Sequence, residues 1–318
     1  MLSPAPSATQ EQRPKNSSCA DTSWTPRPVS WASTTPTSSA AATTSPALSF
    51  LGEYQQAVEL HRQTLTGYER VLGTDHPHTL NSRNNLANAL HSLGEHQQAA
   101  DLHRRVLADR ERILGTNHPS ILESRYNLAI ALDDLGEHRQ AADLYRRVLA
   151  DRERVLGTDH PDTLKSRNNL AAALNDLGEH QQAADLHRRV LADRERILGT
   201  NHPDTRGSRN NLAIALNDLG EHQQAADLHR QTLTDRERIL GPDHPHTLSS
   251  RNNLAIALNG LGEHQQAADL HRRVLADRER ILGPDHPHTL SSRSNLAIAR
   301  ARLAEVGRRR WWRLPRRR

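Results

Sequence analysis

Residues 161–202 read PDTLKSRNNLAAALNDLGEHQQAADLHRRVLADRERILGTNH, and this 42-residue block recurs in register through most of the chain. His-Pro keeps the 42-residue step from His76-Pro77 to His286-Pro287. Leu-Gly keeps the same step, with its leucine at Leu51, Leu93, Leu135, Leu177, Leu219 and Leu261. A fixed period of this size without insertions indicates stacked structural repeats, which present an extended surface for binding other molecules. The sequence therefore predicts one elongated repeat domain.

Each unit is predicted to form two antiparallel helices. The first begins at Pro77, because proline suits the first helical position, and Gly94 ends it. Its apolar stripe consists of Leu80, Leu86, Ala89, Leu90 and Leu93, and that of the second helix of Ala99, Leu102, Val106, Leu107, Ile113 and Leu114. We therefore predict an all-α solenoid of about five full repeats. It is extended at its ends by a second helix at 53–72 and a first helix at 287–303.

The two ends of the chain differ in composition from the repeats. Residues 1–46 are rich in Ser, Thr, Pro and Ala and are predicted to be disordered, whereas 47–303 form the solenoid. The tail, residues 304–318, is predicted to be disordered and basic. Residues 300–318 hold nine Arg and one Glu, while 51–299 hold 30 basic and 34 acidic residues. The tail could bind nucleic acid through Arg and Trp, or be sequence read out of frame; we favour the second and do not expect nucleic acid as a partner.

The composition excludes several classes of protein. Cys19 is the only cysteine, so no internal disulfide framework exists, and no 18-residue apolar run is present. The first residues lack a basic segment followed by an apolar one, so we expect no signal peptide. The only lysines are Lys15 and Lys165, and no phosphate-binding glycine loop is present. Carboxylates such as Asp109 and Glu111 stand among arginines in the usual solvated pattern. We predict a cytoplasmic protein with no membrane span, no catalytic residues and no cofactor.

Twenty histidines raise the question of a metal site. His-Pro in every turn indicates a local turn or capping role, and His96 and His103 lie seven residues apart on one helix. Chelation by two helical histidines prefers a spacing of four, as in His-Glu-x-x-His, and that motif is absent. We therefore predict structural histidines and no metal.

The repeat resembles the tetratricopeptide repeats of kinesin light chains and their bacterial relatives. The resemblance rests on Asn168-Asn169-Leu170-Ala171, Leu177-Gly178-Glu179, Ala183, residues 191–196 (LADRER) and residues 198–203 (LGTNHP). It implies a protein-interaction scaffold that binds peptides in a concave groove lined by the first helices. Bacterial arrays of this type often follow a nucleotide-binding regulatory module, so a sensor or oligomerisation array is an alternative. HEAT-like repeats share the period, but the Leu-Gly and His-Pro pairs disfavour them.

Two aromatic positions of the resembled family are filled mainly by histidine here. The family usually has tyrosine after Leu-Gly-Glu and again seven residues later. This chain has Tyr54 and then His96, His138, His180, His222 and His264 at the first position, and His61, His103, Tyr145, His187, His229 and His271 at the second. We therefore expect a core of Leu, Ile, Val and Ala completed by histidine.

Paired asparagines on the first helix form the candidate binding face. Asparagine is a mediocre helix former, so its repetition at mid-helix needs a compensating role. In the resembled family this face contacts the ligand backbone, and an amide can both donate and accept. The predicted groove residues are Asn84, Asn85, Asn127, Asn168, Asn169, Asn210, Asn211, Asn252, Asn253, Asp134, Asp176 and Asp218. The alternative is an Asn–Asn ladder between neighbouring first helices that serves stacking alone.

Two further expectations concern copies of the repeat and of the chain. Residues 93–115, 177–199 and 261–283 are identical, which indicates recent duplication or a repetitive partner, and we favour duplication. The helix at 53–72 lacks a preceding first helix, so its stripe of Ala57, Leu60, Leu65 and Leu72 should be exposed. We therefore predict self-association through the N-terminal end of the array.

Overall fold

The computed structural model describes residues 46–116 and 118–312, which form helices and turns without a strand. The segment predicted to be disordered at 1–46 lies outside these residues except for Pro46. Within the described part of the chain, no helix is long and apolar enough to cross a membrane. The helices are α1 (Pro46–Leu72), α2 (Pro77–Leu93), α3 (His96–Leu114), α4 (Pro119–Asp134), α5 (His138–Leu156), α6 (Pro161–Asp176), α7 (His180–Leu198), α8 (Pro203–Asp218), α9 (His222–Leu240), α10 (Pro245–Gly260), α11 (His264–Leu282) and α12 (Pro287–Trp312).

Each first helix begins at the His-Pro pair, as predicted. His160 has extended backbone, and its Nδ1 accepts a hydrogen bond from the backbone N–H of Asp162 at 3.1 Å, while Pro161 occupies the first helical position. The same cap, at 3.1–3.2 Å, recurs at His76, His118, His202, His244 and His286. Histidine thus supplies the acceptor that Ser or Asp usually supplies at a helix N-terminus. The predicted capping role of these histidines is confirmed.

Glycines end the helices because the chain turns there through the left-handed region. Gly178 has φ 82° and Gly199 has φ 84°, values that favour glycine over residues with a Cβ. At position 304 alanine replaces the glycine, and α12 continues through Trp312. The predicted end of this helix at 303 was therefore wrong, and residues 304–312 are helical where disorder was predicted. The predicted start at 53 was also wrong, since α1 begins at Pro46.

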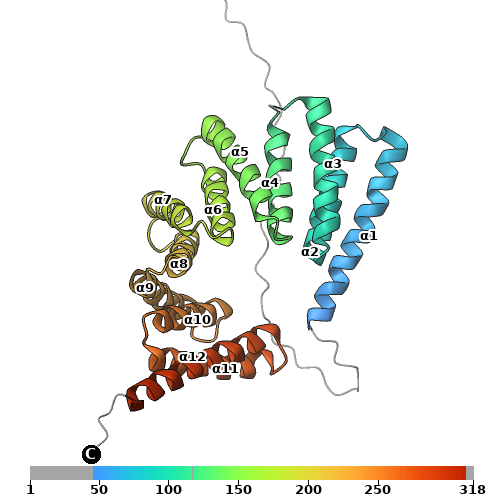
Figure 1. Cartoon of the computed structure of the whole chain (residues 1–318). Helices are drawn as coiled ribbons and strands as arrows, with labels where there is room; N and C mark the ends of the chain where they lie inside the picture. Colours follow the sequence, from blue (N-terminus) through green and yellow to red (C-terminus); the bar gives the residue numbers. More distant parts are fainter. Residues whose placement is uncertain (1–45, 117, 313–318) are drawn as a thin grey trace, which may run out of the picture. The chain divides into compact units, whose positions relative to one another are not determined.

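Consecutive helices pack on each other from α1 to α12. The first helices also approach one another, since α2 contacts α4 and α8 contacts both α6 and α10. No comparable contact joins one second helix to the next among the described helices. The first helices therefore lie on the inner side of the curved array, and the second helices lie on its outer side (Figure 1). This arrangement confirms the all-α solenoid of antiparallel helix pairs.

Small and branched residues fill the space between helices. Ala183, Ala184, Leu170, Leu174 and Val190 are buried, as are most of their counterparts in other repeats. The C-terminal half of the second helix departs from the predicted stripe. Ile113 and Leu114 are exposed, whereas Arg110 is buried. In this half of the helix, hydrogen bonds of buried arginine side chains replace the apolar contacts that the sequence predicted.

On each first helix from α2 to α10, one arginine joins two second helices. Arg167 donates to Glu153 of α5 at 2.7 Å and to Asp193 of α7 at 2.8 Å. The same bridge recurs at Arg83, Arg125, Arg209 and Arg251. Asp109 and Glu111 take part in these bridges, so the interpretation of such carboxylates as merely solvated was wrong. The repeated Asp-Arg-Glu-Arg sequence holds neighbouring repeats together.

The two arginines of that sequence also have partners outside their own helix. Arg110 donates to the Ser124 hydroxyl at 2.7 Å and to the Asn81 side-chain oxygen at 2.6 Å. Arg112 forms a paired contact with Asp75 at 2.7 and 3.0 Å. This exposed pair lowers the pKa of Asp75 through its hydrogen bonds to Arg112. All four residues of the sequence therefore contribute to packing between helices.

One repeat carries an arginine at a leucine core position. Arg206 stands where other repeats have Leu164 and Leu248, is 8% exposed, and donates to the Asn201 carbonyl at 2.6 Å without a carboxylate partner among the described residues. We expect Arg206→Leu to raise the free energy of unfolding by about 2 kcal/mol, because it buries an apolar side chain in place of a charge. Urea unfolding of the full chain measures this, with Leu164→Arg as the opposite change. A less stable Arg206→Leu variant would contradict it.

The ends of the array are partly solvated. Leu60 is 63% exposed, whereas its counterparts on later second helices are partly buried. Leu72 is also exposed, but Ala57 and Leu65 are partly buried and Val58 is buried against α2, so the stripe of α1 is covered in part. At the other end Leu290 of α12 is 46% exposed, while the corresponding Leu248 is buried. Self-association through α1 stays a prediction.

Candidate functional site

The paired asparagines form a ladder between neighbouring first helices. Asn211 donates its Nδ2 to Oδ1 of Asn168 at 3.1 Å, and the same step joins Asn127 to Asn84, Asn253 to Asn210 and Asn295 to Asn252 at 3.0–3.3 Å. Tyr126 replaces the first asparagine in one repeat, and Asn169 donates to its hydroxyl at 2.9 Å. The ladder that the sequence left open as an alternative is therefore present. It gives these asparagines a stacking role.

The ladder uses only some of the hydrogen-bond donors and acceptors of each asparagine side chain. Asn127, Asn211 and Asn253 each donate through Nδ2, but their Oδ1 atoms accept no hydrogen bond from described residues. Asn84 is buried and Asn85 is exposed, while the other predicted asparagines are partly buried. Acceptors of this kind, partly open to solvent along the inner side, remain available to a ligand's N–H groups.

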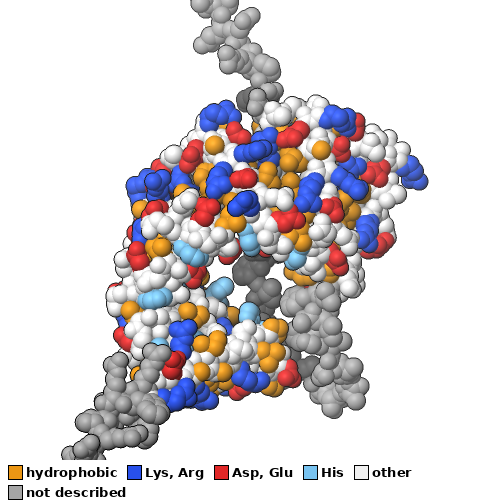
Figure 2. All heavy atoms as spheres, in the orientation of Figure 1, with side chains coloured by type: hydrophobic (Ala, Val, Ile, Leu, Met, Phe, Trp, Pro, Cys, Tyr) orange, Lys and Arg blue, Asp and Glu red, His pale blue; other side chains and the backbone are white. Residues whose placement is uncertain are grey.

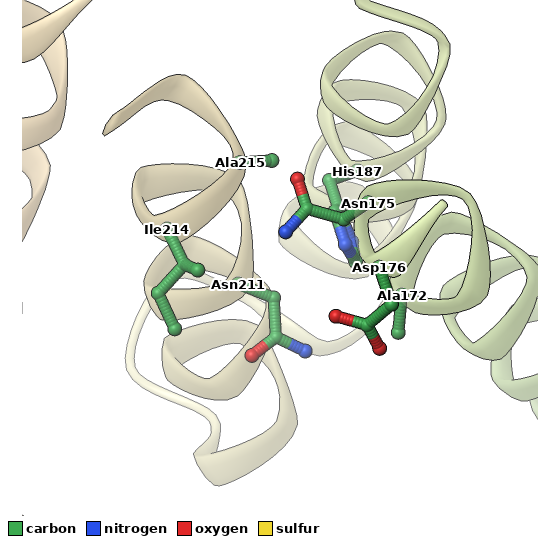
Figure 3. Close-up of a pocket in the computed structure, with 7 residues that line it drawn as sticks. All are labelled: Ala172, Asn175, Asp176, His187, Asn211, Ile214 and Ala215. Atoms are coloured by element: carbon green, nitrogen blue, oxygen red, sulfur yellow. The ribbon is translucent and has the colours of Figure 1, made fainter. Parts of the chain in front are cut away.

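A pocket of about 160 Å³ lies where α6 and α8 meet above α7. Figure 3 shows the side chains of Asn175, Asp176 and His187 on one side of it, facing Asn211 and Ile214 of α8. The full lining is Ala172, Asn175, Asp176, His187, Asn211, Ile214 and Ala215. The sequence placed Asn211 and Asp176 on this face, and the structure brings them to one pocket.

The pocket recurs at the 42-residue step. Between α8 and α10 a pocket of about 180 Å³ is lined by Ile214, Asn217, Asp218, His229, Asn253 and Ile256. Between α10 and α12 a pocket of about 470 Å³ is lined by Asn217, His222, Ile256, Asn259, Gly260, His271, Asn295, Ile298 and Arg302. Each pocket therefore combines a buried histidine, an amide and an exposed isoleucine. The first two pockets contain a carboxylate, Asp176 or Asp218. In the third pocket Gly260 stands at that position, and Arg302 is part of the lining.

The buried histidines were predicted to complete the core, and the structure adds that they line the pockets. His187, His229 and His271 are buried, and the Nδ1 atom of each lacks a hydrogen-bond partner among the described residues. Burial lowers the pKa of each imidazole to about 4, so all three are neutral at pH 7. Tyr145 occupies the same position in one repeat. The period-42 histidines were visible in the sequence, but their exposure to the inner face was not.

The three predicted aspartates lie near the C-terminal ends of the first helices and are exposed. Asp134 accepts a hydrogen bond from His91, and Asp218 accepts one from Asn175 at 2.8 Å. Asp176 lines the first pocket. Figure 2 shows histidines (pale blue) around the hollow on the inner side, where basic side chains are sparse compared with the surface over α3–α5. The inner face is thus mostly uncharged, with acidic groups along one edge.

Family models of the tetratricopeptide repeat match residues 47–112, 143–196, 162–238 and 204–280, and a further tetratricopeptide model matches 121–162. These matches cover well over half of the chain. The chain belongs to the tetratricopeptide repeat family. Tetratricopeptide arrays serve in general as scaffolds for protein interactions. No curated protein sequence matches the chain.

Solved structures place this tetratricopeptide array near the kinesin light chains, as its residues predicted. A kinesin light chain-like protein of Podosopora anserina with nearly identical TPR-like repeats is 32% identical, with a TM-score of 0.57. That match covers 64% of this chain and 97% of the other. BtubC (BKLC) from P. vanneervenii is 19% identical with a TM-score of 0.55, covering 76% of this chain and 94% of that one, and shares the fold.

Proposed function

We propose that the array is a non-catalytic scaffold that binds an extended peptide segment along the inner face of the first helices. The observation that carries this proposal is the recurrence of one pocket between α6 and α8, between α8 and α10, and between α10 and α12. A row of equivalent pockets suits a chain of residues, because successive side chains of a peptide can enter successive pockets. The open Oδ1 atoms of Asn211 and Asn253 can accept the peptide's backbone N–H groups.

The size of the pockets supports a side chain as the occupant. Small-molecule sites usually measure roughly 300–1,000 Å³. The pockets of about 160 and 180 Å³ are smaller than this range and suit one side chain each. Ile214 and Ile256 give each of them an exposed apolar lip, and a neutral histidine forms part of the wall. The first two pockets therefore favour small or medium apolar side chains.

Charge along the row gives the peptide a direction. Asp176 and Asp218 stand at the first two pockets, whereas Gly260 and Arg302 stand at the third. We propose that basic or neutral residues of the ligand lie over α6–α10 and that an acidic residue or carboxylate lies near α12. The aspartates at the groove edge favour basic side chains of the ligand, and Arg302 favours an acidic group at the other end of the row.

A substitution test must spare the asparagine ladder. Removing Asn127, Asn169 and Asn211 together would also remove three hydrogen bonds between repeats, so lost binding could reflect lost stability. The exposed isoleucines avoid this difficulty. Ile214→Arg with Ile256→Arg places charge over two pockets at positions that are already open to solvent.

We expect a random peptide display library panned on the full chain to enrich peptides that the double variant binds at least tenfold more weakly. The physical reason is the loss of the apolar lip and the blocking of two pockets. Ile197→Arg is the matched control, because Ile197 is equally exposed but lies at the end of the second helix α7. Fluorescence anisotropy with the enriched peptides measures the affinities. Equal binding by wild type and the double variant would show that the peptides do not bind in the groove.

A further inference from the structure

Three potential metal ligands meet at the junction of the first two complete repeats. His91 lies in the last turn of α2, His96 is the first residue of α3, and Asp134 is the last residue of α4. One ligand atom from each side chain lies within 4.8 Å of the other two. The imidazoles of His91 and His96 contact each other edge to face with centroids 5.0 Å apart, and Nε2 of His91 hydrogen-bonds to Oδ2 of Asp134.

This junction differs from its counterparts because of one residue. At the positions equivalent to 91, other repeats have Asp133, Asn175, Asn217 and Asn259. The side-chain oxygen of each contacts Nδ1 of the histidine that begins the next helix, at 2.8, 3.0, 3.0 and 2.6 Å. His91 provides a nitrogen in place of that oxygen. As a result Nδ1 of His96 is buried without a hydrogen-bond partner among the described residues.

The donor set selects the kind of cation. Two imidazole nitrogens and one carboxylate oxygen suit Zn²⁺, whereas Mg²⁺ and Ca²⁺ prefer oxygen alone. Zinc bonds to these atoms measure roughly 2.0–2.2 Å, so tetrahedral ligand atoms stand about 3.3 Å apart. Rotation of three partly open side chains can bring the atoms to that separation without moving the helices. Three protein ligands leave a fourth position for water.

We propose that His91, His96 and Asp134 form a zinc-binding site that ties α2 and α3 to α4. The site links two adjacent repeats at the N-terminal part of the array, where α1 leaves apolar side chains uncovered. The sequence predicted no metal, because helical histidines four residues apart are absent from it. Here the two histidines lie five apart across the turn at Gly94, and the third ligand comes from the following repeat.

The chain offers its own control. His91→Asn installs the residue found at 175, 217 and 259, and its side-chain oxygen restores a partner for Nδ1 of His96, so the fold should be kept. His180→Asn removes one imidazole from the equivalent of position 96 in a repeat without the triad. A second group, Asp133, His138 and Asp176, has one imidazole only and is less suited to zinc.

The experiment titrates Zn²⁺ and Co²⁺ into the full chain after treatment with a chelator. Because exposed histidines elsewhere also bind zinc, the readout is the difference between variants. By calorimetry, we expect wild type and His180→Asn to bind one more equivalent of Zn²⁺ than His91→Asn. The affinity for that additional equivalent should be at least tenfold tighter than the affinity of the exposed histidines elsewhere. Co²⁺ in this site should show the intense visible band of a tetrahedral ion, and the His91→Asn chain should lack it. Equal stoichiometry and spectra in wild type and His91→Asn, or the same loss in His180→Asn, would overturn the proposal, with circular dichroism verifying the fold.

Discussion

Acidification from pH 7 to pH 5 is expected to cost the array about 2 kcal/mol of unfolding free energy for each of its four buried histidines. His103, His187, His229 and His271 are buried, and burial lowers the pKa of each imidazole from 6.5 to about 4. Well above pH 6.5 neither the folded nor the unfolded state holds a proton on these rings. Between pH 6.5 and 4 only the unfolded state does, so stability falls as the pH falls through this window.

The chain itself suggests the variant that tests this. Tyr145 occupies the same position in one repeat, is buried, and does not titrate in acid. Replacing all four histidines with tyrosine should therefore remove most of the difference between the thermal unfolding midpoints at pH 7 and pH 5, and His187→Tyr alone about a quarter of it. A fourfold tyrosine variant with an unchanged pH dependence would show that the buried imidazoles are not the cause.

Arg209→Met is expected to lower the free energy of unfolding by about 3–5 kcal/mol. The Arg209 side chain is 2% exposed and donates to Asp235 at 3.0 Å, to Glu195 at 3.5 Å and to the Thr200 carbonyl at 3.3 Å. Methionine keeps much of the side-chain volume, so the loss comes from leaving two carboxylates and a carbonyl without their shared donor. Urea unfolding followed by circular dichroism measures the change.

An exposed ion pair provides the comparison for Arg209. Arg188 is 39% exposed and pairs with Asp185 at 2.8 Å and Glu221 at 3.5 Å. Arg188→Met should cost less than about 1 kcal/mol, because solvent screens such pairs. Combining Arg209→Met with Asp235→Ala should cost less than the sum of the two single changes, since the double variant removes both charges of one pair. Similar losses for Arg209→Met and Arg188→Met would mean that the buried bridges contribute little to stacking.

The features that the sequence predicted correctly are set by local geometry. Pro161 and Gly178 mark helix ends through the backbone angles that they allow, and the period of 42 follows from their recurrence. The face that carries Asn211 and Ile214 follows from helical spacing alone. The predicted helix start at 53 was wrong because Gly52 lies inside α1 and does not interrupt it. The predicted helix end at 303 was wrong because residue 304 is alanine, which allows α12 to continue.

The sequence by itself thus determined the helices, their pairing and the face that lines the inner side, because each depends on residues close together in the chain. The tertiary structure decided which atoms meet. The offset between stacked repeats joins Asn211 to Asn168, places His187 under a pocket, and brings Asp134 to His91. That offset arises from the packing of whole helices on one another, summed over many side chains. A repeat pattern gives the period of such contacts but not their register in space.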